Sequence, residues 1–412
     1  MSNLKKHEYT QNVSPPSSVK TPLVAVIGVG FVGAELIDSF SSKYNVLGFD
    51  INENRLKELK KDFVLRPNVT LTCTESDLKK ATHFLISVPT LLCPDKSINL
   101  SYLKSALQKV EKYAETGSTV VIESSVAVGH TRELLGPIAV ARGLFAGMSP
   151  ERVDPGRTLP SMRAIPKVIS GLDDIVPGSL NVIQQLYSYV FDEVIPVSSP
   201  EVAEMTKLYE NCQRMMGIAY ANEMANACQS IGIDPFEVCR ASATKPFGYL
   251  PFAPSVGIGG HCIPINPYYL FATSDFPLLK AATEAMEDRP FKIANDILRS
   301  LAGKCGDRDS GAELNPKVLV VGMGFKAGQR HLVNSPGLRL AQELKRSGLE
   351  VLWADAMVPQ TDIPDINRLD DDDWHEEKLE GFDLIVICHR QFGMDFEVLS
   401  WLESVDVRMW CD

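Results

Sequence analysis

The sequence predicts an α/β protein with two parallel-sheet domains that are joined by a central domain containing a long helix. Short apolar runs alternate with stretches of helical periodicity in the first half of the chain, which is typical of β-α-β units. Residues 201–233 then keep apolar residues near helical spacing without a proline, which predicts one long helix. After this helix the strand–glycine turn–helix pattern of the first half returns in the same order. Two Rossmann-like domains on either side of a helical centre explain all three observations.

Length and composition restrict the class of protein further. A chain of 412 residues suits two or three domains, and 45% hydrophobic with 23% charged residues is typical of a folded, soluble protein. The net charge of −11 disfavours binding to nucleic acid or to an anionic membrane, and no apolar run approaches the ~18 residues of a membrane span. The N-terminus has no apolar segment typical of a secretory signal. Nine dispersed cysteines without a CxxC pair argue against disulfides and a metal site, so we predict a cytoplasmic protein without bound metal.

The first domain is predicted over residues 21–199. Two adjacent prolines and several serines indicate a flexible tail at 1–20 before it. The run PLVAVIGVGFVGAELIDSF then predicts a strand, a glycine-rich turn and a helix, and YNVLGFD predicts a second strand that ends at Asp50. Apolar runs at 82–90 and 118–125 predict two further buried strands, with helical stretches between them.

The central and C-terminal parts are predicted over residues 200–300 and 301–412. In the central part, the long helix has a candidate kink at Gly217 and is followed by a loop rich in glycine and proline and by a second helical stretch. In the C-terminal part, the segments KVLVVGMGF, EVLWADA and FDLIVICH repeat the pattern of LVAVIGVGF, NVLGFDI and THFLISV. A short acidic run at 370–373 is interpreted as a solvated loop.

The first glycine-rich turn predicts a dinucleotide site. Gly28, Gly30 and Gly33 form a G-x-G-x-x-G motif between a predicted strand and a predicted helix. The first glycine permits the tight turn, the second lets a pyrophosphate approach the backbone, and the third permits close packing of the helix on the strand. Asp50 follows 22 residues after Gly28 and is placed to accept a hydrogen bond from a ribose 2′-hydroxyl, which favours NAD over NADP. The alternative is a glycine turn that is needed only for packing.

The second glycine-rich turn predicts a different ligand. Gly322 and Gly324 lack the third glycine of the motif, and the acidic residue Asp355 follows 33 residues after Gly322 instead of about 20. A second NAD is therefore not expected. A nucleotide of another kind, bound with help from Lys326, fits the segment better.

Three further segments carry residue types that are suited to catalysis. Cys262 lies in the glycine-rich loop GIGGHCIP, where little side-chain cover and the neighbouring His261 favour an accessible nucleophilic thiolate, although most free cysteines are buried hydrophobic residues. Lys207 and Asn211 are four residues apart and share one face of the long helix, and such a pair is usually solvent-facing. Glu151 follows a predicted strand and either places a carboxylate at the edge of the sheet or simply belongs to a turn.

These residues and motifs resemble the UDP-glucose/GDP-mannose dehydrogenase family from about residue 21 to the end of the chain. The resemblance rests on GVGFVG, GFDIN with Arg55, SVPT, ESSVAVGHT, SPERVDPG, AEMTKLYEN, GIGGHCIP, and GMGFK followed by NSPG. Within the family, KLYEN followed by ATKPFGYLPF and GGHCIPINPYYL is most similar to the branch that acts on UDP-N-acetylhexosamines. That branch oxidises the 6-hydroxyl group of the sugar to the uronic acid.

The resemblance implies a catalytic role for each matching position. It makes Cys262 the nucleophile that holds the 6-aldehyde as a thiohemiacetal, which a second hydride transfer converts into a thioester that water hydrolyses. It implies that Lys207 stabilises oxyanion charge and that Asn211 positions the sugar oxygen or the water. Glu151 is then a general acid or base, and Ser125 orients a water where the family usually has threonine. The implied catalytic set is Cys262, Lys207, Asn211, Glu151, Ser125 and Asn266.

The resemblance also implies the binding residues and the partners. NAD is expected at Gly28, Gly30, Phe31, Val32, Gly33, Asp50, Arg55, Pro89, Thr90 and Ser124. A UDP-sugar substrate is expected at Glu151, Arg152, Lys207, Asn211, Phe252, Gly259, Lys326 and Arg330. Lys326 and the loop Phe247–Gly260 are expected to hold the nucleotide end. The family forms dimers through the long central helix, so a homodimer or larger homo-oligomer is expected.

Three positions depart from the family pattern. Asn266 stands four residues after Cys262, where the family normally has an aspartate, and an amide cannot accept a proton. Val333 stands where the family has an arginine that reaches the sugar of a neighbouring subunit, and Arg330 would replace it only after a rearrangement of the loop. Ser255 stands where the substrate loop commonly has glycine. All three changes lie in the substrate and hydrolysis machinery.

Several functions stay open at this point. UDP-N-acetylglucosamine or its manno epimer is the first substrate expected, and UDP-glucose is the second. A two-electron β-hydroxyacid dehydrogenase also pairs a G-x-G-x-x-G domain with a Lys-x-x-x-Asn helix, but it needs neither the Cys262 loop nor the second Rossmann-like domain. A non-catalytic nucleotide-sugar sensor, suggested by Asn266 and Val333, would bind NAD and UDP-sugar without forming NADH.

Overall fold

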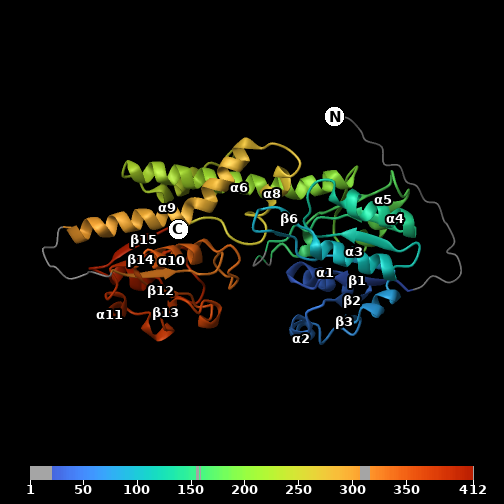
Figure 1. The fold of residues 1–412 in the computed structure, drawn as a ribbon, viewed down its shortest axis with the longest axis horizontal. Coiled ribbons are helices and arrows are strands. Elements are labelled where there is room, and N and C mark those ends of the chain that lie inside the picture. Colours follow the sequence, from blue (N-terminus) through green and yellow to red (C-terminus); the bar gives the residue numbers. More distant parts are fainter. Residues whose placement is uncertain (1–20, 155–156, 158, 307–315, 412) are drawn as a thin grey trace.

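The structure is a computed structural model that describes residues 21–154, 157, 159–306 and 316–411. The predicted tail at 1–20 lies outside the described residues. Figure 1 shows one α/β lobe formed by the N-terminal half of the chain, a second formed by the C-terminal part, and one long helix that runs along both lobes. The predicted α/β class, with two Rossmann-like domains and a long central helix, is confirmed.

The N-terminal sheet has eight strands in the order β10-β9-β8-β7-β4-β1-β2-β3. Their bounds are β1 Leu23–Ile27, β2 Asn45–Phe49, β3 Val69–Thr72, β4 His83–Ile86, β7 Thr119–Ile122, β8 Phe145–Met148, β9 Lys167–Gly171 and β10 Val194–Pro196. The strand order reverses between β1 and β4, and doubly wound sheets bind ligands outside the carboxyl ends of the strands at such a point.

One strand pair departs from the parallel arrangement. β9 runs antiparallel to β8, and β10 runs parallel to β9. A parallel pair needs a crossover connection, usually a helix, whereas the described part of the segment between β8 and β9 holds only the short 3-10 turn η3 (Met162–Ala164). The reversal brings the start of β9 next to the residues that follow β8.

The connections of this lobe are mostly helices. They are α1 Phe31–Ser41, α2 Glu53–Asp62, α3 Ser101–Tyr113, α4 Gly136–Arg142 and α5 Ser179–Ser188, with the turns η1 Glu75–Lys80 and η2 Thr131–Leu135. A short hairpin, β5 Leu91–Leu92 and β6 Ile98–Asn99, follows β4. Apolar side chains of the strands pack against these helices on both faces of the sheet, which explains the continuous apolar runs in the sequence.

The central part consists of α6 Pro200–Ser230, α7 Pro235–Ala243, α8 Asn266–Phe271 and α9 Pro277–Gly306. Ser199 caps α6 by accepting from the backbone N–H of Val202, and Pro200 occupies its first turn. The helix is continuous through Gly217. A Cβ at Gly217 would overlap the ring of Phe252, so this glycine is needed for packing of the following loop.

The C-terminal sheet is parallel and has the order β13-β12-β11-β14-β15. Its strands are β11 Lys317–Val321, β12 Glu350–Ala354, β13 Asn367–Arg368, β14 Leu384–Ile387 and β15 Asp406–Met409, with helices α10 Pro336–Arg346 and α11 Glu376–Leu379 and the turns η4 Gln360–Asp362 and η6 Glu397–Trp401. The acidic run at 370–373 forms the exposed turn η5 (Asp371–Asp373), in agreement with the prediction of a solvated loop.

Two properties of the described residues bear on function. No helix among them is both long and apolar enough to cross a membrane. The same residues contain no group of three or more histidine, cysteine or acidic side chains that could hold a metal ion.

Candidate active site

The first glycine-rich turn has the geometry of a pyrophosphate site. Gly28 has φ +88°, in the left-handed region that favours glycine, and a Cβ on Gly33 would overlap the carbonyl group of Gly28. A Cβ on Gly30 would meet no atom within 4 Å, so the backbone there is open to a ligand. No side chain caps the N-terminus of α1 at Gly30, which leaves its N–H groups available to a phosphate. The turn therefore fits the pyrophosphate of NAD.

Asp50 and Arg55 hold this turn from the end of β2 and from α2. Asp50 accepts hydrogen bonds from the backbone N–H groups of Val29 and Asn52, both at 2.8 Å. Arg55 donates from Nε to the carbonyl oxygen of Val29 at 3.0 Å. A carboxylate has further acceptor positions, so Asp50 can bind a ribose hydroxyl while it holds the turn.

The other predicted cofactor residues lie around the same turn. Phe31 is 46% exposed, and Val32 follows it in the first turn of α1. Pro89 and Thr90 follow β4, whereas Ser124 follows the neighbouring strand β7 and donates to the backbone after β4 at 2.7 Å. Because β4 pairs with β1, the ends of these strands meet the glycine turn.

We expect the Asp50→Ala variant to bind NAD about tenfold more weakly, because it loses a ribose hydrogen-bond pair of ~1.4 kcal/mol. The measurement is the dissociation constant of NAD by titration calorimetry. The matched control is Asp62→Ala, which removes an exposed carboxylate at the end of α2. An unchanged NAD affinity in Asp50→Ala would mean that the ribose lies elsewhere.

A cleft of about 1170 Å³ is lined by residues from the N-terminal lobe, the central helices and the C-terminal lobe. The predicted site residues in its lining are Gly30, Phe31, Arg55, Lys207, Phe252, Gly259, Cys262 and Lys326. The dinucleotide turn, the cysteine loop and the second glycine-rich turn thus open onto one cavity.

Lys207, which lines this cleft, forms a buried pair with Glu151, which is not among the lining residues. Lys207 is 4% exposed and Glu151 is 7% exposed. The ammonium group of Lys207 donates to the carbonyl oxygen of Glu151 and lies 3.8 Å from its carboxylate. Lys207 is therefore not a solvent-facing residue of a long helix. A cation held in a dry wall of a cleft is suited to stabilise negative charge on a ligand.

Asn211, one turn later on α6, belongs to a second buried contact. Its amide donates to the side-chain oxygen of Asn266, and its own oxygen accepts from Arg214. Asn211 is fully buried, and Asn266 is 2% exposed. The backbone N–H of Asn266 donates to the carbonyl oxygen of Cys262 at 2.9 Å. The helix that carries the polar pair is thus in contact with the loop that carries the cysteine.

Cys262 is partly exposed and lines the cleft beside His261. Burial, and to a smaller extent the nearby His331, lower the pKa of His261. The imidazole is therefore neutral at pH 7, and it brings no positive charge to the thiol. Lys207 and Arg214 supply positive charge to the cleft wall instead.

Ser125 lies in the loop that leads from β7 to η2. The helix α6 holds this loop through Glu204, which is 1% exposed and accepts from the backbone N–H groups of Gly129 at 2.6 Å and Thr131 at 2.8 Å. Sequence reasoning did not identify Glu204. A glutamate on a helix carries no signal of this kind until the loop that it binds is located.

Three predicted substrate residues differ in their surroundings. Arg152 forms an ion pair with Glu210 of α6 at 2.6 Å, and this ion pair connects the segment after β8 to the central helix. Lys326 lies in the cleft and forms an ion pair with Asp154 at 2.7 Å. A phosphate bound here would compete with Asp154 for Lys326. Arg330 is exposed and is not among the residues that line the cleft.

Val333, the position where the family has an arginine, supports the cysteine loop through its backbone. Its carbonyl oxygen accepts from the N–H of Gly260 at 2.8 Å, and the amide of Asn334 donates to the carbonyl of Gly260 at 3.0 Å. A Cβ at Gly259 would lie 2.8 Å from Phe325, so this loop also packs closely against the second glycine-rich turn. The hydroxyl of Ser255 donates to the carbonyl oxygen of Gly257 at 3.0 Å, so a serine is accommodated there.

The cleft also holds polar side chains that sequence reasoning missed. Arg214 lies seven residues after Lys207 and so on the same face of α6, a spacing that could have identified it. His389 follows β14 and Trp410 follows β15, and both line the cleft. Among the described residues, Nε2 of His389 and Nε1 of Trp410 are buried without a hydrogen-bond partner. Both residues follow strands of a Rossmann-like sheet, and this position in the sequence could have identified them as ligand-binding candidates.

Comparisons with known proteins identify the family of the chain. A model of the NAD binding domain of the UDP-glucose/GDP-mannose dehydrogenase family matches residues 22–191, and a model of its central domain matches residues 201–287. Protein CapL of Staphylococcus aureus is 33% identical over 90% of this chain and 90% of its own. The UDP-N-acetyl-D-glucosamine 6-dehydrogenase of Pseudomonas aeruginosa is 30% identical over 82% of this chain and 84% of its own.

A solved structure shows the same fold over nearly the whole chain. It is the UDP-D-ManNAc dehydrogenase of Pyrococcus horikoshii, with a TM-score of 0.81 at 26% identity, covering 94% of this chain and 99% of that chain. The matched domains include the glycine turn, the central helix and the buried pair described above. The chain therefore belongs to the UDP-glucose/GDP-mannose dehydrogenase family of NAD-dependent oxidoreductases.

Proposed function

We propose that the chain oxidises the 6-hydroxyl group of a UDP-N-acetylhexosamine to the uronic acid through a covalent intermediate on Cys262. The observation that carries the proposal is that Lys207 and Cys262 line the cleft that also holds the dinucleotide turn. Lys207 pairs there with Glu151, and the neighbouring Asn211 contacts Asn266 of the cysteine loop. The similar proteins of Pseudomonas aeruginosa and Pyrococcus horikoshii are named for UDP-N-acetylhexosamine substrates, and they support this sugar class.

The proposed chemistry uses the chain's own residues as follows. NAD, when bound at the first glycine turn, accepts a hydride in each of two oxidations. Between them the Cys262 sulfur adds to the aldehyde carbon, and the thiol proton passes to the new hydroxyl oxygen. The second oxidation breaks the remaining C–H bond and leaves a thioester. Water then cleaves the carbon–sulfur bond, which releases the carboxylate and restores the thiol.

The other predicted catalytic residues have separate roles in this proposal. Lys207 stabilises negative charge on the sugar oxygen, and Asn211 orients that oxygen or the attacking water. Glu151 moves the proton of the hydroxyl group or of the water, because Asn266 cannot accept one. Ser125 orients the water from the loop that Glu204 holds.

The nucleotide end of the substrate is proposed to lie at the C-terminal side of the cleft. Lys326 and the loop Phe247–Gly260 would hold it, and the unpaired ring nitrogens of His389 and Trp410 are available for polar atoms of the base or ribose. We accordingly assign NAD binding to residues 21–199, the cysteine loop to 200–300 and nucleotide-sugar binding to 301–412.

A second copy of the chain is the proposed partner of α6. Large apolar side chains are exposed along this helix and at the residue that follows it, at spacings of seven, four, four and seven residues, namely Tyr209, Met216, Tyr220, Met224 and Ile231. These spacings place them on one face, which is typical of a helix that packs against another. Sedimentation velocity tests for the homodimer.

The cysteines among the described residues are free, which supports a cytoplasmic location.

The test of the function is the number of NADH formed per sugar consumed, measured with UDP-N-acetylglucosamine, UDP-N-acetylmannosamine, UDP-glucose and GDP-mannose. We expect two NADH per sugar with one of the two N-acetylhexosamines. Two NADH per sugar with UDP-glucose alone would identify UDP-glucose as the substrate instead. One NADH per sugar with accumulating aldehyde would mean that the second oxidation fails. Two NADH per enzyme-bound sugar in a single turnover, with a thioester that persists on Cys262, would mean that hydrolysis fails at Asn266. NAD binding without NADH from any sugar would favour the alternative of a nucleotide-sugar sensor.

A further inference from the structure

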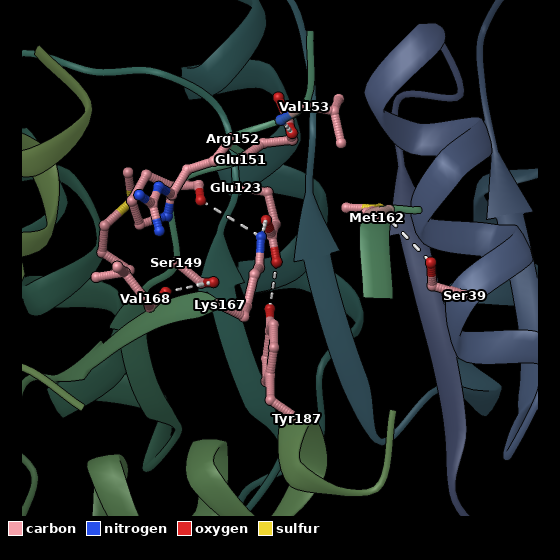
Figure 2. Close-up of polar contacts among 12 residues, drawn as sticks. Ser39, Glu123, Ser149, Glu151, Arg152, Val153, Met162, Lys167, Val168 and Tyr187 are labelled. Atoms are coloured by element: carbon pink, nitrogen blue, oxygen red, sulfur yellow. Dashed lines mark hydrogen bonds and ion pairs between the residues drawn. The ribbon is translucent and has the colours of Figure 1, made fainter. Parts of the chain in front are cut away.

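We propose that Lys167 is a positioning residue for Glu151, whose backbone it fixes from a buried ionic cluster that does not line the cleft. The proposal rests on the catalytic role proposed above for Glu151. The cluster consists of Glu123, Lys167 and Tyr187, which are 1%, 3% and 0% exposed. None of the three is among the residues that line the cleft. Figure 2 shows the cluster with Glu151 on one side of Glu123 and Tyr187 on the other.

The cluster is held together by charge-assisted contacts. Lys167 Nζ lies 2.5 Å from Oε2 of Glu123, and the hydroxyl of Tyr187 donates to Oε1 of the same carboxylate. The ammonium group also lies 5.5 Å from the ring centroid of Phe191. A buried ion pair contributes little net stability compared with apolar residues of similar volume. Stability alone therefore does not account for a lysine and a glutamate at this depth.

Contacts of Lys167, Glu123 and the neighbouring Val168 reach three consecutive residues after β8. Ser149 donates from its hydroxyl to the backbone of β9 at 2.8 Å. Lys167 Nζ lies 3.4 Å from the carbonyl oxygen of Pro150, and the backbone N–H of Glu151 donates to the carbonyl oxygen of Glu123 at 3.4 Å. β9 runs antiparallel to β8, and this direction places Lys167 beside the end of β8, where it can make these contacts.

Two lysines thus hold the two peptide groups that flank the α-carbon of Glu151. Lys167 binds the carbonyl of Pro150, which belongs to the peptide group before it, and Lys207 binds the carbonyl of Glu151, which belongs to the peptide group after it. Each peptide group is planar, so the two contacts together restrict both backbone dihedral angles of Glu151. The direction of its Cα–Cβ bond follows from these angles, and the backbone N–H of Val153, which donates to the carboxylate of Glu151, holds the end of the side chain.

The Lys167→Met variant tests the proposal because it keeps an unbranched side chain and removes the donor. We expect kcat for NADH formation to fall by roughly 10-fold to 100-fold, as a catalytic group is displaced, while KM for the UDP-sugar and Kd for NAD change less than about twofold. The melting temperature is expected to fall as well, since Glu123 is left buried without a cation. A kcat that stays near that of the unaltered protein would overturn the proposal.

The double variant Lys167→Met/Glu123→Gln separates positioning from stability. It removes both charges, so we expect the melting temperature to return toward that of the unaltered protein while kcat stays low, because the carbonyl of Pro150 still has no donor. Recovery of both quantities would show that the pair is only structural. This variant also supplies the kinetic measurement if the single variant does not fold.

Two further variants complete the experiment. Tyr187→Phe is the matched control, since it removes a donor to Glu123 on the side away from Glu151, and we expect a lower melting temperature with kcat within about twofold. Glu151→Gln shows whether the proposed function holds. If Glu151→Gln loses kcat and Lys167→Met does not, only the positioning proposal fails. If Glu151→Gln keeps its kcat, the role of Glu151 itself is wrong.

Discussion

The Cys262→Ser variant is expected to form at most one NADH per sugar, with a rate of uronic acid formation at least ~10³-fold below that of the unaltered protein. A serine hydroxyl is a far weaker nucleophile than a thiolate, so the aldehyde is not captured for the second oxidation. The first oxidation does not need the sulfur, and the aldehyde is therefore expected to accumulate or to leave the cleft. The measurement combines NADH absorbance with quantification of aldehyde and uronic acid.

The control for this prediction is Cys73→Ser, which makes the same change at an exposed cysteine on the N-terminal lobe. It is expected to keep both the rate and the two NADH per sugar. A Cys262→Ser variant that still yields two NADH per sugar would exclude a covalent intermediate on this residue. Its partly exposed position in the cleft would then reflect packing of the loop.

Features that are determined by residues close together in the sequence could be predicted. The first glycine turn is an example, because the positive φ of Gly28 and the close approach at Gly33 are required by the strand–turn–helix geometry itself. The long helix α6 is another, since apolar spacing extends over its whole length and Ser199 and Pro200 mark its start. The parallel pairing of most strands follows from the alternation of strands and helices, whereas the antiparallel β9 does not.

The parts that depend on contacts between distant segments could not be predicted in the same way. Lys207 and Glu151 are 56 residues apart, and the sequence left open whether the lysine faces solvent. Burial of the Lys207 side chain decides this question, and that burial arises only when β8 and α6 pack together. Val333 supports the cysteine loop through a carbonyl oxygen, which every residue type possesses. The buried Lys167 likewise carries no local signal, because its partner lies 44 residues earlier in the chain.

The Lys207→Met variant is expected to lose ~10²–10³-fold in kcat, which is the usual effect of removing one donor to a developing oxyanion. Methionine keeps the length of the side chain and removes the charge. Because Lys207 is 4% exposed, its ammonium group acts in surroundings with little water, where a charge interaction is stronger than at the surface. NAD affinity is expected to stay the same, since the dinucleotide turn does not contact Lys207.

The measurement is kcat and KM for the UDP-sugar together with Kd for NAD, on protein whose folding is checked by its melting temperature. Lys60→Met, an exposed lysine of α2, is the matched control and is expected to change none of these values. The contact with the carbonyl of Glu151 gives Lys207 a structural role as well, so KM is informative. A raised KM with an unchanged kcat would show that Lys207 only holds the wall of the cleft, because charge stabilisation in the transition state requires a loss in kcat.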